Sequence, residues 1–288
     1  MSSAYAYLDN NWKLRAQNEV LEDPDKVVDN ISALKNLLRD EPELYPRTDD
    51  TFLLAFLRAR KHDVNEAFTL LKRFYEVKKN YPVHFEDCLP TEKGYIYDIE
   101  GLTVLDQCDN DERIVIVLRV EKADLKKVTI ENLFQQLSTT LSFFLEDQRV
   151  QISGISIIMD LKGFGFKHLF ALTPSSALLL TRLFQDCFPI RLKAIHVVNE
   201  PIFIGSLFSL FKPFIKEKLR KRIHFHGTNL SSLHACLPYE ILPRQLGGMV
   251  PDFNFTTFRR IFEENEDVIR GNNGQLSINT GNGRHSAR

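Results

Sequence analysis

Two short apolar runs, each as long as a single strand, most constrain how this chain can fold. They are GISIIMD at 154–160 and AIHVV at 194–198. Neither run has the polar alternation of a half-exposed strand, so we predict strands that are buried on both faces. The segment between them begins a helix at Thr173 and Pro174, because proline favours the first turn of a helix. A helix that joins two buried strands predicts a parallel sheet covered by helices.

The neighbouring segments extend the same pattern. Short β-rich runs at 102–105 and 114–119 are joined by a polar turn, and 222–226 supplies a last strand. Apolar residues at helical spacing over 129–147 and 202–211 predict helices that cover the sheet. The expected fold class is therefore α/β, with a mostly parallel sheet between helices in an α/β/α arrangement.

The first third of the chain has an all-helical pattern instead. Apolar residues recur at helical spacing from Asp25 to Pro82, and Asp63 followed by Glu66 is typical of a helix start. We therefore predict an N-terminal all-helical lobe ahead of the α/β domain. The expected segments are a flexible lead-in (1–24), the helical lobe (25–90), the α/β domain (91–252), a C-terminal helix (253–270) and a disordered Gly/Asn-rich tail (271–288).

Composition and charge narrow the classes of function. The 288-residue chain has a net charge of −1, so an affinity for nucleic acid or membranes would need a local patch. The 22 phenylalanines suit a large apolar interior. The four cysteines are far apart without metal-binding spacing, which indicates reduced thiols in a cytosolic protein. No apolar run reaches the about 20 residues of a membrane span, and the first residues do not read as a secretory leader.

Signatures of catalysis and metal binding are missing from the sequence. It contains no nucleophile elbow, no P-loop and no dinucleotide-binding fingerprint. Asp160 ends a predicted strand, where α/β enzymes place catalytic groups, but an anchor for the following loop explains it equally well. His196, His224 and His226 fall on predicted strands, and histidines satisfied within the sheet are favoured over metal ligands. We therefore expect no enzyme activity, no catalytic residue, no metal and no cofactor.

An apolar run and a basic run adjoin in the second half of the chain. Residues 202–211 are almost wholly apolar, and 216–222 carry five cations against one anion. The apolar run is too short to cross a bilayer, so it is a core helix, a lid over an apolar cavity or a segment at a membrane interface. In the basic run, Lys212, Lys216 and Arg220 have the spacing of one helical stripe.

These cations have two interpretations. They are either a solvated helix face that complements the helix dipole or a docking patch for an anionic membrane. Near an anionic leaflet each cation contributes about 1 kcal/mol, so five or six suffice for reversible docking. Nucleic acid is a poorer match, because apolar side chains adjoin the patch.

Several motifs taken together resemble the CRAL-TRIO lipid-transfer family. In the family's order they are FLRAR (56–60), FP-x-R (188–191), VNEP (198–201), KPF-x-KEK (212–218), RI-x-x-HG (222–227) and ILP-x-x-x-GG (241–248). The resemblance covers about 49–251 and is greatest for the branch of the alpha-tocopherol transfer proteins and the clavesins. It implies a helical lobe followed by an α/β lipid-binding domain.

The resemblance also implies where a ligand and a membrane would bind. A closed cavity would hold one hydrophobic molecule between walls at Phe134, Leu137, Leu141, Ile155, Leu180, Leu183, Phe184, Phe188, Ile190, Ile195, Ile204 and Leu207. A mobile gate helix is implied over 201–211, with membrane contacts at Ile202, Phe203, Leu207 and Leu210. Phosphoinositide head groups would be recognised by Arg60, Arg191, Lys193, Lys218 and Arg222.

The function implied by the resemblance is that of a carrier. It would bind a tocopherol-, retinoid- or other lipid-like molecule and exchange it at phosphoinositide-bearing membranes. Its expected place is the cytoplasm, with reversible association with endosomal or other phosphoinositide-rich membranes, and we expect a monomer. The alternative is a phosphoinositide-binding adaptor in endosomal or lysosomal trafficking, resembling the clavesins, whose cavity is mainly structural.

Overall fold

A five-stranded sheet lies at the centre of the computed structural model, which describes residues 8–41, 44, 46–165, 168, 170 and 174–274. β1 is antiparallel to β2, and the remaining neighbours are parallel. The predicted α/β fold with a mostly parallel sheet is therefore confirmed. The strands lie side by side in chain order: β1 (Leu102–Val104), β2 (Ile114–Arg119), β3 (Ile155–Asp160), β4 (Leu192–Val198) and β5 (Ile223–Phe225).

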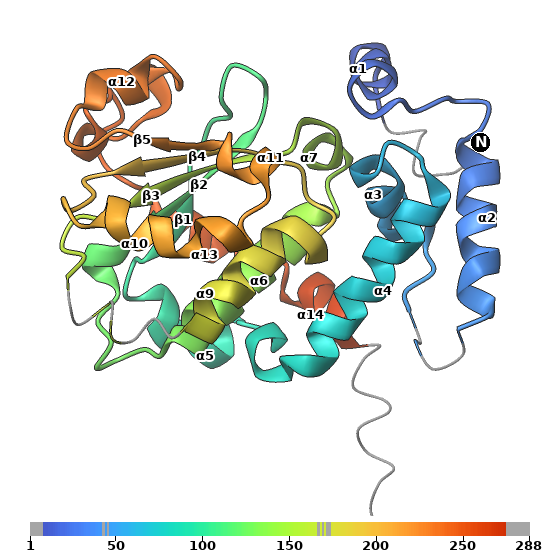
Figure 1. Cartoon of the computed structure of the whole chain (residues 1–288), viewed down its shortest axis with the longest axis horizontal. Helices are drawn as coiled ribbons and strands as arrows, with labels where there is room; N and C mark the ends of the chain where they lie inside the picture. Colours follow the sequence, from blue (N-terminus) through green and yellow to red (C-terminus); the bar gives the residue numbers. More distant parts are fainter. Residues whose placement is uncertain are drawn as a thin grey trace, which may run out of the picture.

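Helices cover both faces of this sheet (Figure 1). On β2, Val115 and Val117 pack with Leu233 of one helical layer, whereas Ile116 packs into the core that includes Leu137 of the other layer. This division follows from the alternation of side chains along a strand. The first layer contains α12 (Leu230–His234), and the second contains α6 (Ile130–Leu145), α9 (Pro174–Arg182) and α10 (Ile204–Phe211).

The helical lobe consists of α2 (Val27–Arg39), α3 (Asp50–Ala59) and α4 (Val64–Asn80), which pack on one another beside the sheet (Figure 1). Asp49 and Asp63 cap α3 and α4, each accepting a hydrogen bond from the backbone N–H three residues on, at 3.0 and 2.9 Å. The apolar faces of the three helices join the same hydrophobic core as β3 and α6. Lobe and sheet are therefore stabilised by one continuous core.

The predicted flexible lead-in is wrong for its described part. α1 (Asn10–Val20) is a helix, and its Trp12 and Ala16 are buried together with Ile152 of α7 (Gln148–Ser153). The partner of this helix is far away in the sequence, so the local pattern did not indicate that the segment is held in place.

Two segments near the C-terminus also differ from expectation. The predicted single helix over 253–270 is two helices, α13 (Phe255–Glu264) and α14 (Glu266–Gly274). Asn265 separates them and donates from Nδ2 to the carbonyl of Ile261 at 2.8 Å. Of the predicted disordered tail, 271–274 belong to α14, and the rest lies outside the described residues.

The basic run does not form the predicted helical stripe. α11 spans only Glu217–Arg220, and the backbone of Lys216 before it is extended. Pro213, which has no backbone N–H, interrupts the chain after α10, so Lys212 and Lys216 do not share a helix with Arg220. The helix that joins α4 to the sheet, α5, spans Pro90–Tyr97. Among the described helices none is long and apolar enough to span a bilayer.

Candidate functional site

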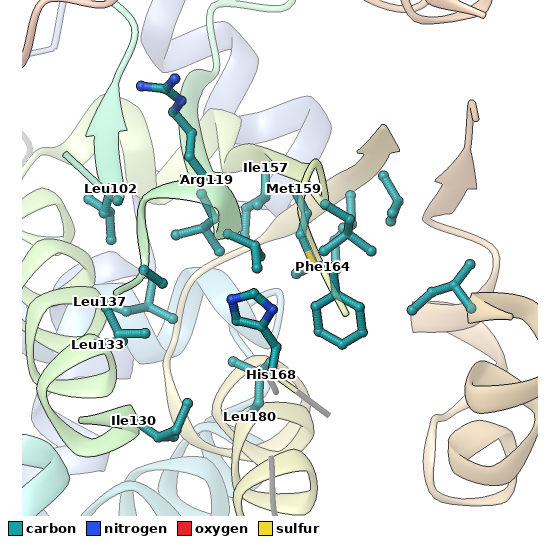
Figure 2. Close-up of a pocket in the computed structure, with 18 of the residues that line it drawn as sticks. Leu102, Arg119, Ile130, Leu133, Leu137, Ile157, Met159, Phe164, His168 and Leu180 are labelled. Atoms are coloured by element: carbon teal, nitrogen blue, oxygen red, sulfur yellow. The ribbon is translucent and has the colours of Figure 1, made fainter. Parts of the chain in front are cut away.

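An apolar cavity of about 380 Å³ lies between the sheet and the layer of α6, α9 and α10 (Figure 2). Its floor includes Ile157 and Met159 of β3 with Ile195 and Val197 of β4. Residues two apart on a strand share a face, so neighbouring parallel strands present a continuous apolar surface. The volume is within the range of about 300–1,000 Å³ that is usual for ligand sites.

The walls of the cavity come from helical positions three or four residues apart, which lie on one face of a helix. Figure 2 shows Phe164 and His168 pointing into the same space as Leu180. The outer side of α10 is exposed at Gly205, Ser206 and Ser209. The helical wall residues include Leu133 and Leu137 of α6, Leu180 of α9, Phe184 of the turn after α9, and Ile204, Leu207 and Phe208 of α10.

The structure brings together seven of the predicted wall residues and separates five from them. Phe134, Leu137, Leu180, Phe184, Ile195, Ile204 and Leu207 line the cavity. The other five are buried in the adjoining core and do not line it, namely Leu141, Ile155, Leu183, Phe188 and Ile190.

The reason for these corrections is the position of each residue along its element. Leu141 is one turn beyond the last α6 residue in the wall, and Ile155 is at the start of β3, two residues before the floor. Leu183 and Ile190 are 1% and 6% exposed within the core shared with the helical lobe. The ring of Phe188 packs in the same core, 5.6 Å from that of Phe74.

Sequence reasoning missed the polar side chains in the cavity wall. Arg119 belongs to the wall, while its guanidinium points away from the cavity (Figure 2). The guanidinium lies over the rings of Phe253 and Phe255, at 4.7 and 5.6 Å. His168 accepts a hydrogen bond through Nδ1 from a backbone N–H at 3.2 Å. Gln136 is 1% exposed. In the sequence, the feature that could have indicated Gln136 is an amide side chain next to the wall leucines of α6.

The predicted membrane contacts beside the cavity have different environments. Ile202 is fully exposed, and Phe203 is half-buried with its ring 6.2 Å from that of Phe164. Leu207 faces the cavity rather than the surface. The side chain of Leu210 lies outside the described residues.

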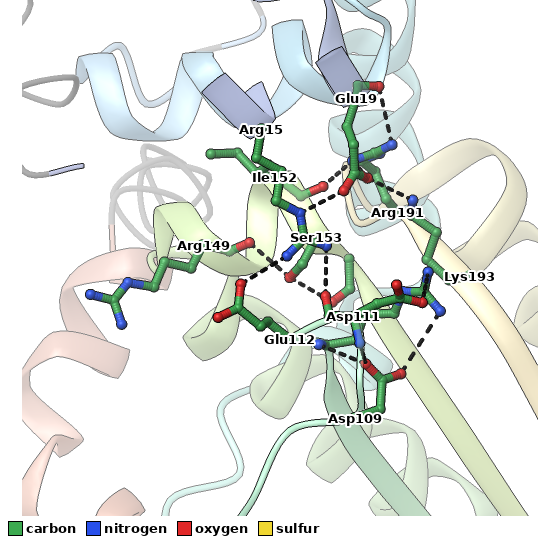
Figure 3. Close-up of polar contacts among 12 residues, drawn as sticks. Arg15, Glu19, Asp109, Asp111, Glu112, Arg149, Ile152, Ser153, Arg191 and Lys193 are labelled. Atoms are coloured by element: carbon green, nitrogen blue, oxygen red, sulfur yellow. Dashed lines mark hydrogen bonds and ion pairs between the residues drawn. The ribbon is translucent and has the colours of Figure 1, made fainter. Parts of the chain in front are cut away.

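Two of the predicted head-group residues, Arg191 and Lys193, are held by a carboxylate. Figure 3 shows Glu19 of α1 between them and Arg15. Oε2 of Glu19 is 3.0 Å from Nη1 of Arg191 and 2.9 Å from Nζ of Lys193, and Oε1 is 2.6 Å from Nε of Arg15. Burial raises the pKa of Glu19, but hydrogen bonds from Lys193 and Arg15 outweigh it and lower the pKa to about 2. Arg191 also donates to the carbonyl of Ile152.

The other three predicted head-group residues have no ion pair within the described part of the chain. They are Arg60, Lys218 and Arg222. Burial lowers the pKa of the Lys218 ammonium, and the nearby charges of Arg222 and Arg60 lower it further. Arg222 donates to the backbone carbonyl of Leu192. Cations that repel one another and form no ion pair favour an anionic ligand.

His196, His226 and Asp160 form hydrogen bonds with neighbouring side chains. Nδ1 of His196 and Nε2 of His226 share a hydrogen bond at 3.0 Å, and burial together with the neighbouring histidines lowers the pKa of His196 to about 4. Cys236 brings a third ligand atom within 4.8 Å, whereas a closed structural zinc site has four. Asp160 accepts a hydrogen bond from Nδ2 of Asn199 at 2.8 Å, as the loop-anchor interpretation predicts.

The chain resembles known proteins in both its helical lobe and its α/β domain. The CRAL/TRIO domain matches residues 99–248, and the CRAL/TRIO N-terminal domain matches 19–73. Human clavesin-2 is 35% identical over 258 residues, which cover 88% of this chain and 78% of that protein. Clavesin-1 of Xenopus laevis is 33% identical over 263 residues, covering 90% of this chain and 79% of that protein.

A third relative and one solved structure complete the comparison. Human alpha-tocopherol transfer protein-like is 34% identical over 254 residues, covering 88% of this chain and 74% of that protein. A chain in the crystal structure of Sfh5 has a TM-score of 0.48 at 15% identity, covering 77% of this chain and 82% of that chain, which is too distant to add to the assignment. The family matches and the identities to these relatives show that the chain belongs to the CRAL-TRIO lipid-binding family.

Proposed function

We propose that this protein carries a single lipophilic molecule in the cavity and exchanges it at phosphoinositide-bearing membranes. The observation that carries the proposal is an apolar cavity of about 380 Å³ with α10 in its wall, followed in the chain by the cations of the basic run. The name of the human alpha-tocopherol transfer protein-like relative connects a similar sequence with the transfer of such a molecule.

The apolar lining provides the affinity for such a ligand. Burying about 400 Å² of apolar ligand surface at about 25 cal/mol per Å² offers roughly 10 kcal/mol before the costs of association. No group in the wall needs to react with the ligand for this binding to be useful, which agrees with a carrier role.

α10 is the element that we propose as the gate. Ile204 and Leu207 contact the cavity from this helix, so its displacement would open the cavity. Large apolar side chains are exposed around it, at Ile202 before the helix, Phe214 after it and Phe225 on β5. The ring of Phe208 on α10 is 5.3 Å from that of Phe225. Exposed apolar groups beside cations suit a contact with a membrane surface.

The head-group site would be the cation cluster of Arg60, Lys218 and Arg222. None of the three forms an ion pair within the described residues, although the charges of Glu66 and Asp186 act on Arg60. Lys218 follows the gate in the chain. Phosphate binding there would compete with closure of α10 and would couple unloading to docking. Arg191 and Lys193 would join once Glu19 is displaced.

Transfer of fluorescent tocopherol from phosphatidylcholine vesicles to acceptors with and without phosphoinositide tests the proposal. We expect phosphoinositide in the acceptor to accelerate transfer by wild type. Lys218→Ala should slow that transfer about fivefold, because one cation near an anionic surface contributes about 1 kcal/mol. The matched control is Lys221→Ala, since Lys221 is exposed and already paired with Glu217 at 2.8 Å. Equal wild-type rates with both acceptors would contradict the coupling, and absence of probe uptake would contradict the carrier.

The second candidate is a phosphoinositide-binding adaptor in endosomal or lysosomal trafficking, resembling the clavesins. It is favoured by the 35% identity to human clavesin-2 and by the cation cluster. Native mass spectrometry of the protein purified from its own cells separates the two functions. A stoichiometric lipophilic ligand supports the carrier, and an empty or randomly filled cavity supports the adaptor.

A further inference from the structure

Helix α6 carries a row of buried polar side chains, which is unusual for a helix between a sheet and a core. Four of them have partners that satisfy them inside the protein. Gln135 donates to the carbonyl of Val83 at 2.7 Å, Ser138 donates to that of His84 at 2.9 Å, Thr139 accepts from the N–H of Cys88 at 3.0 Å, and Thr140 donates to the carbonyl of Gln136 at 2.7 Å.

The side chain of Gln136 is the exception in this row. It is 1% exposed and belongs to the cavity wall, and its Oε1 has no hydrogen-bond partner among the described residues. A buried carboxamide oxygen that has lost water without gaining a donor is destabilising. A ligand hydroxyl, like a bound water, would supply the missing donor and remove this cost.

The remaining polar wall residues make contacts of their own, although Nε of Arg119, like Oε1 of Gln136, has no hydrogen-bond partner among the described residues. The guanidinium of Arg119 lies over aromatic rings outside the cavity, and His168 and Thr181 have interactions of their own. No cation of the described wall therefore points into the cavity to neutralise a charged ligand. The other lining residues are apolar, so Gln136 is one of four polar side chains, with Arg119, His168 and Thr181, in a largely apolar surface.

We infer that Gln136 determines the specificity of this cavity by hydrogen-bonding a hydroxyl group of the bound lipid. A hydroxyl both donates and accepts, so it satisfies the carboxamide in either orientation of its oxygen and nitrogen. The ligand class that follows is a lipophilic alcohol with one hydroxyl, in preference to a hydrocarbon or a charged lipid. This inference rests on the proposed lipid binding and adds the class of ligand.

Competition between matched probes tests the inference on the full-length, delipidated protein. Equimolar phytol and phytane, and in a second experiment cholesterol and cholestane, are offered together, and the bound ratio is measured by mass spectrometry. We expect wild type to prefer the alcohol about tenfold in at least one pair, the effect of one buried hydrogen bond. Gln136→Leu should bring that ratio to about one. Leu145→Met, which changes an apolar position of the same helix outside the cavity wall, should leave the preference unchanged.

The melting temperature of the ligand-free protein provides a second readout. Gln136→Leu replaces an unpaired buried amide by an apolar side chain, so its melting temperature should equal or exceed that of wild type. A marked fall would show that the amide has a structural partner and would overturn the inference. Equal binding of alcohol and alkane by wild type, or an alcohol preference that survives in Gln136→Leu, would also overturn it while leaving lipid binding intact. If wild type takes up none of the four probes, the proposed lipid binding fails as well.

Discussion

Two glutamates three residues apart, Glu19 and Glu22, each meet cations from distant segments, but in opposite environments. Oε2 of Glu22 is 2.6 Å from Nε of Arg58, and both side chains are 0% exposed. Glu19 is 26% exposed, and its partners Arg191 and Lys193 are 17% and 18% exposed. The contact distances are similar, so the difference between the pairs lies in access to solvent.

That difference separates a structural ion pair from an exchangeable one. Nη1 of Arg58 also donates to Oε1 of Gln151 at 2.8 Å, and Glu22 contacts His62 at 3.2 Å, so the buried pair belongs to a closed network. Breaking it would leave an uncompensated buried charge. A partly exposed pair such as that of Glu19 is weakened by salt, and a more highly charged anion such as a phosphate can take the place of its carboxylate. We therefore assign Glu22 to stability and Glu19 to control of the cations beside it.

Removal of Arg58 is the largest expected effect. Arg58→Ala should lower the free energy of unfolding by about 3–5 kcal/mol, because the buried Glu22 loses its guanidinium partner and keeps only the contact with His62. Urea denaturation measures this loss. The double variant Arg58→Met with Glu22→Leu, which removes both charges, should lose less than the single variant. A single variant that loses less than about 1 kcal/mol would remove the distinction between the two glutamates.

Acid should destabilise the protein through both glutamates, because the pKa of each is lowered to about 2. Burial raises the pKa of Glu22, but hydrogen bonds from Arg58 and His62 outweigh it and lower the pKa to about 2, from 4.5. The unfolded chain therefore takes up this proton at a higher pH than the folded chain, so the stabilisation is present above about pH 4.5 and is lost as the pH falls to about 2. The loss amounts to about 3 kcal/mol.

The free energy of unfolding, followed from pH 5 to 2 at low and high salt, checks this prediction. Glu22→Gln should flatten the acid slope at both salt concentrations. Glu19→Gln should flatten it mainly at low salt, because the partly exposed pair is screened more than the buried one. The same salt dependence for both variants would mean that burial does not distinguish the pairs.

Most of the fold could be predicted from local patterns. The strands at 154–160 and 194–198 and the caps Asp49 and Asp63 follow from apolar periodicity and capping residues that are close together in the sequence. Helix α1 could not be predicted in this way. Its buried face packs on Ile152, and no local signal indicates a partner more than a hundred residues away.

The cavity wall could be predicted from the spacing of apolar residues along the helices. The ion-pair and hydrogen-bond partners of the polar residues could not be predicted from the sequence. Side chains three or four apart on α6 and α10 lead to the cavity wall. The partners of Glu19 are 172 and 174 residues further along the chain, so the sequence could not show that Arg191 and Lys193 are already held. The unpaired amide of Gln136 is likewise visible only once the partners of its neighbours on α6 are known.

Removal of the partly exposed carboxylate of Glu19 should have the smallest effect on stability. Glu19→Gln should cost less stability than Arg58→Ala, because the pairs of Glu19 are partly exposed and are screened by solvent. It should strengthen binding to phosphoinositide-containing vesicles about fivefold, because Arg191 and Lys193 no longer have to exchange a carboxylate for a phosphate. Vesicle cosedimentation measures the gain. The matched control is Glu112→Gln, since Glu112 is 3.0 Å from Arg15 and has no ion pair with Arg191 or Lys193. Both variants remove one negative charge. Equal gains in vesicle binding would therefore show that only net charge matters. A gain confined to Glu19→Gln would show that Glu19 competes with the head group for Arg191 and Lys193.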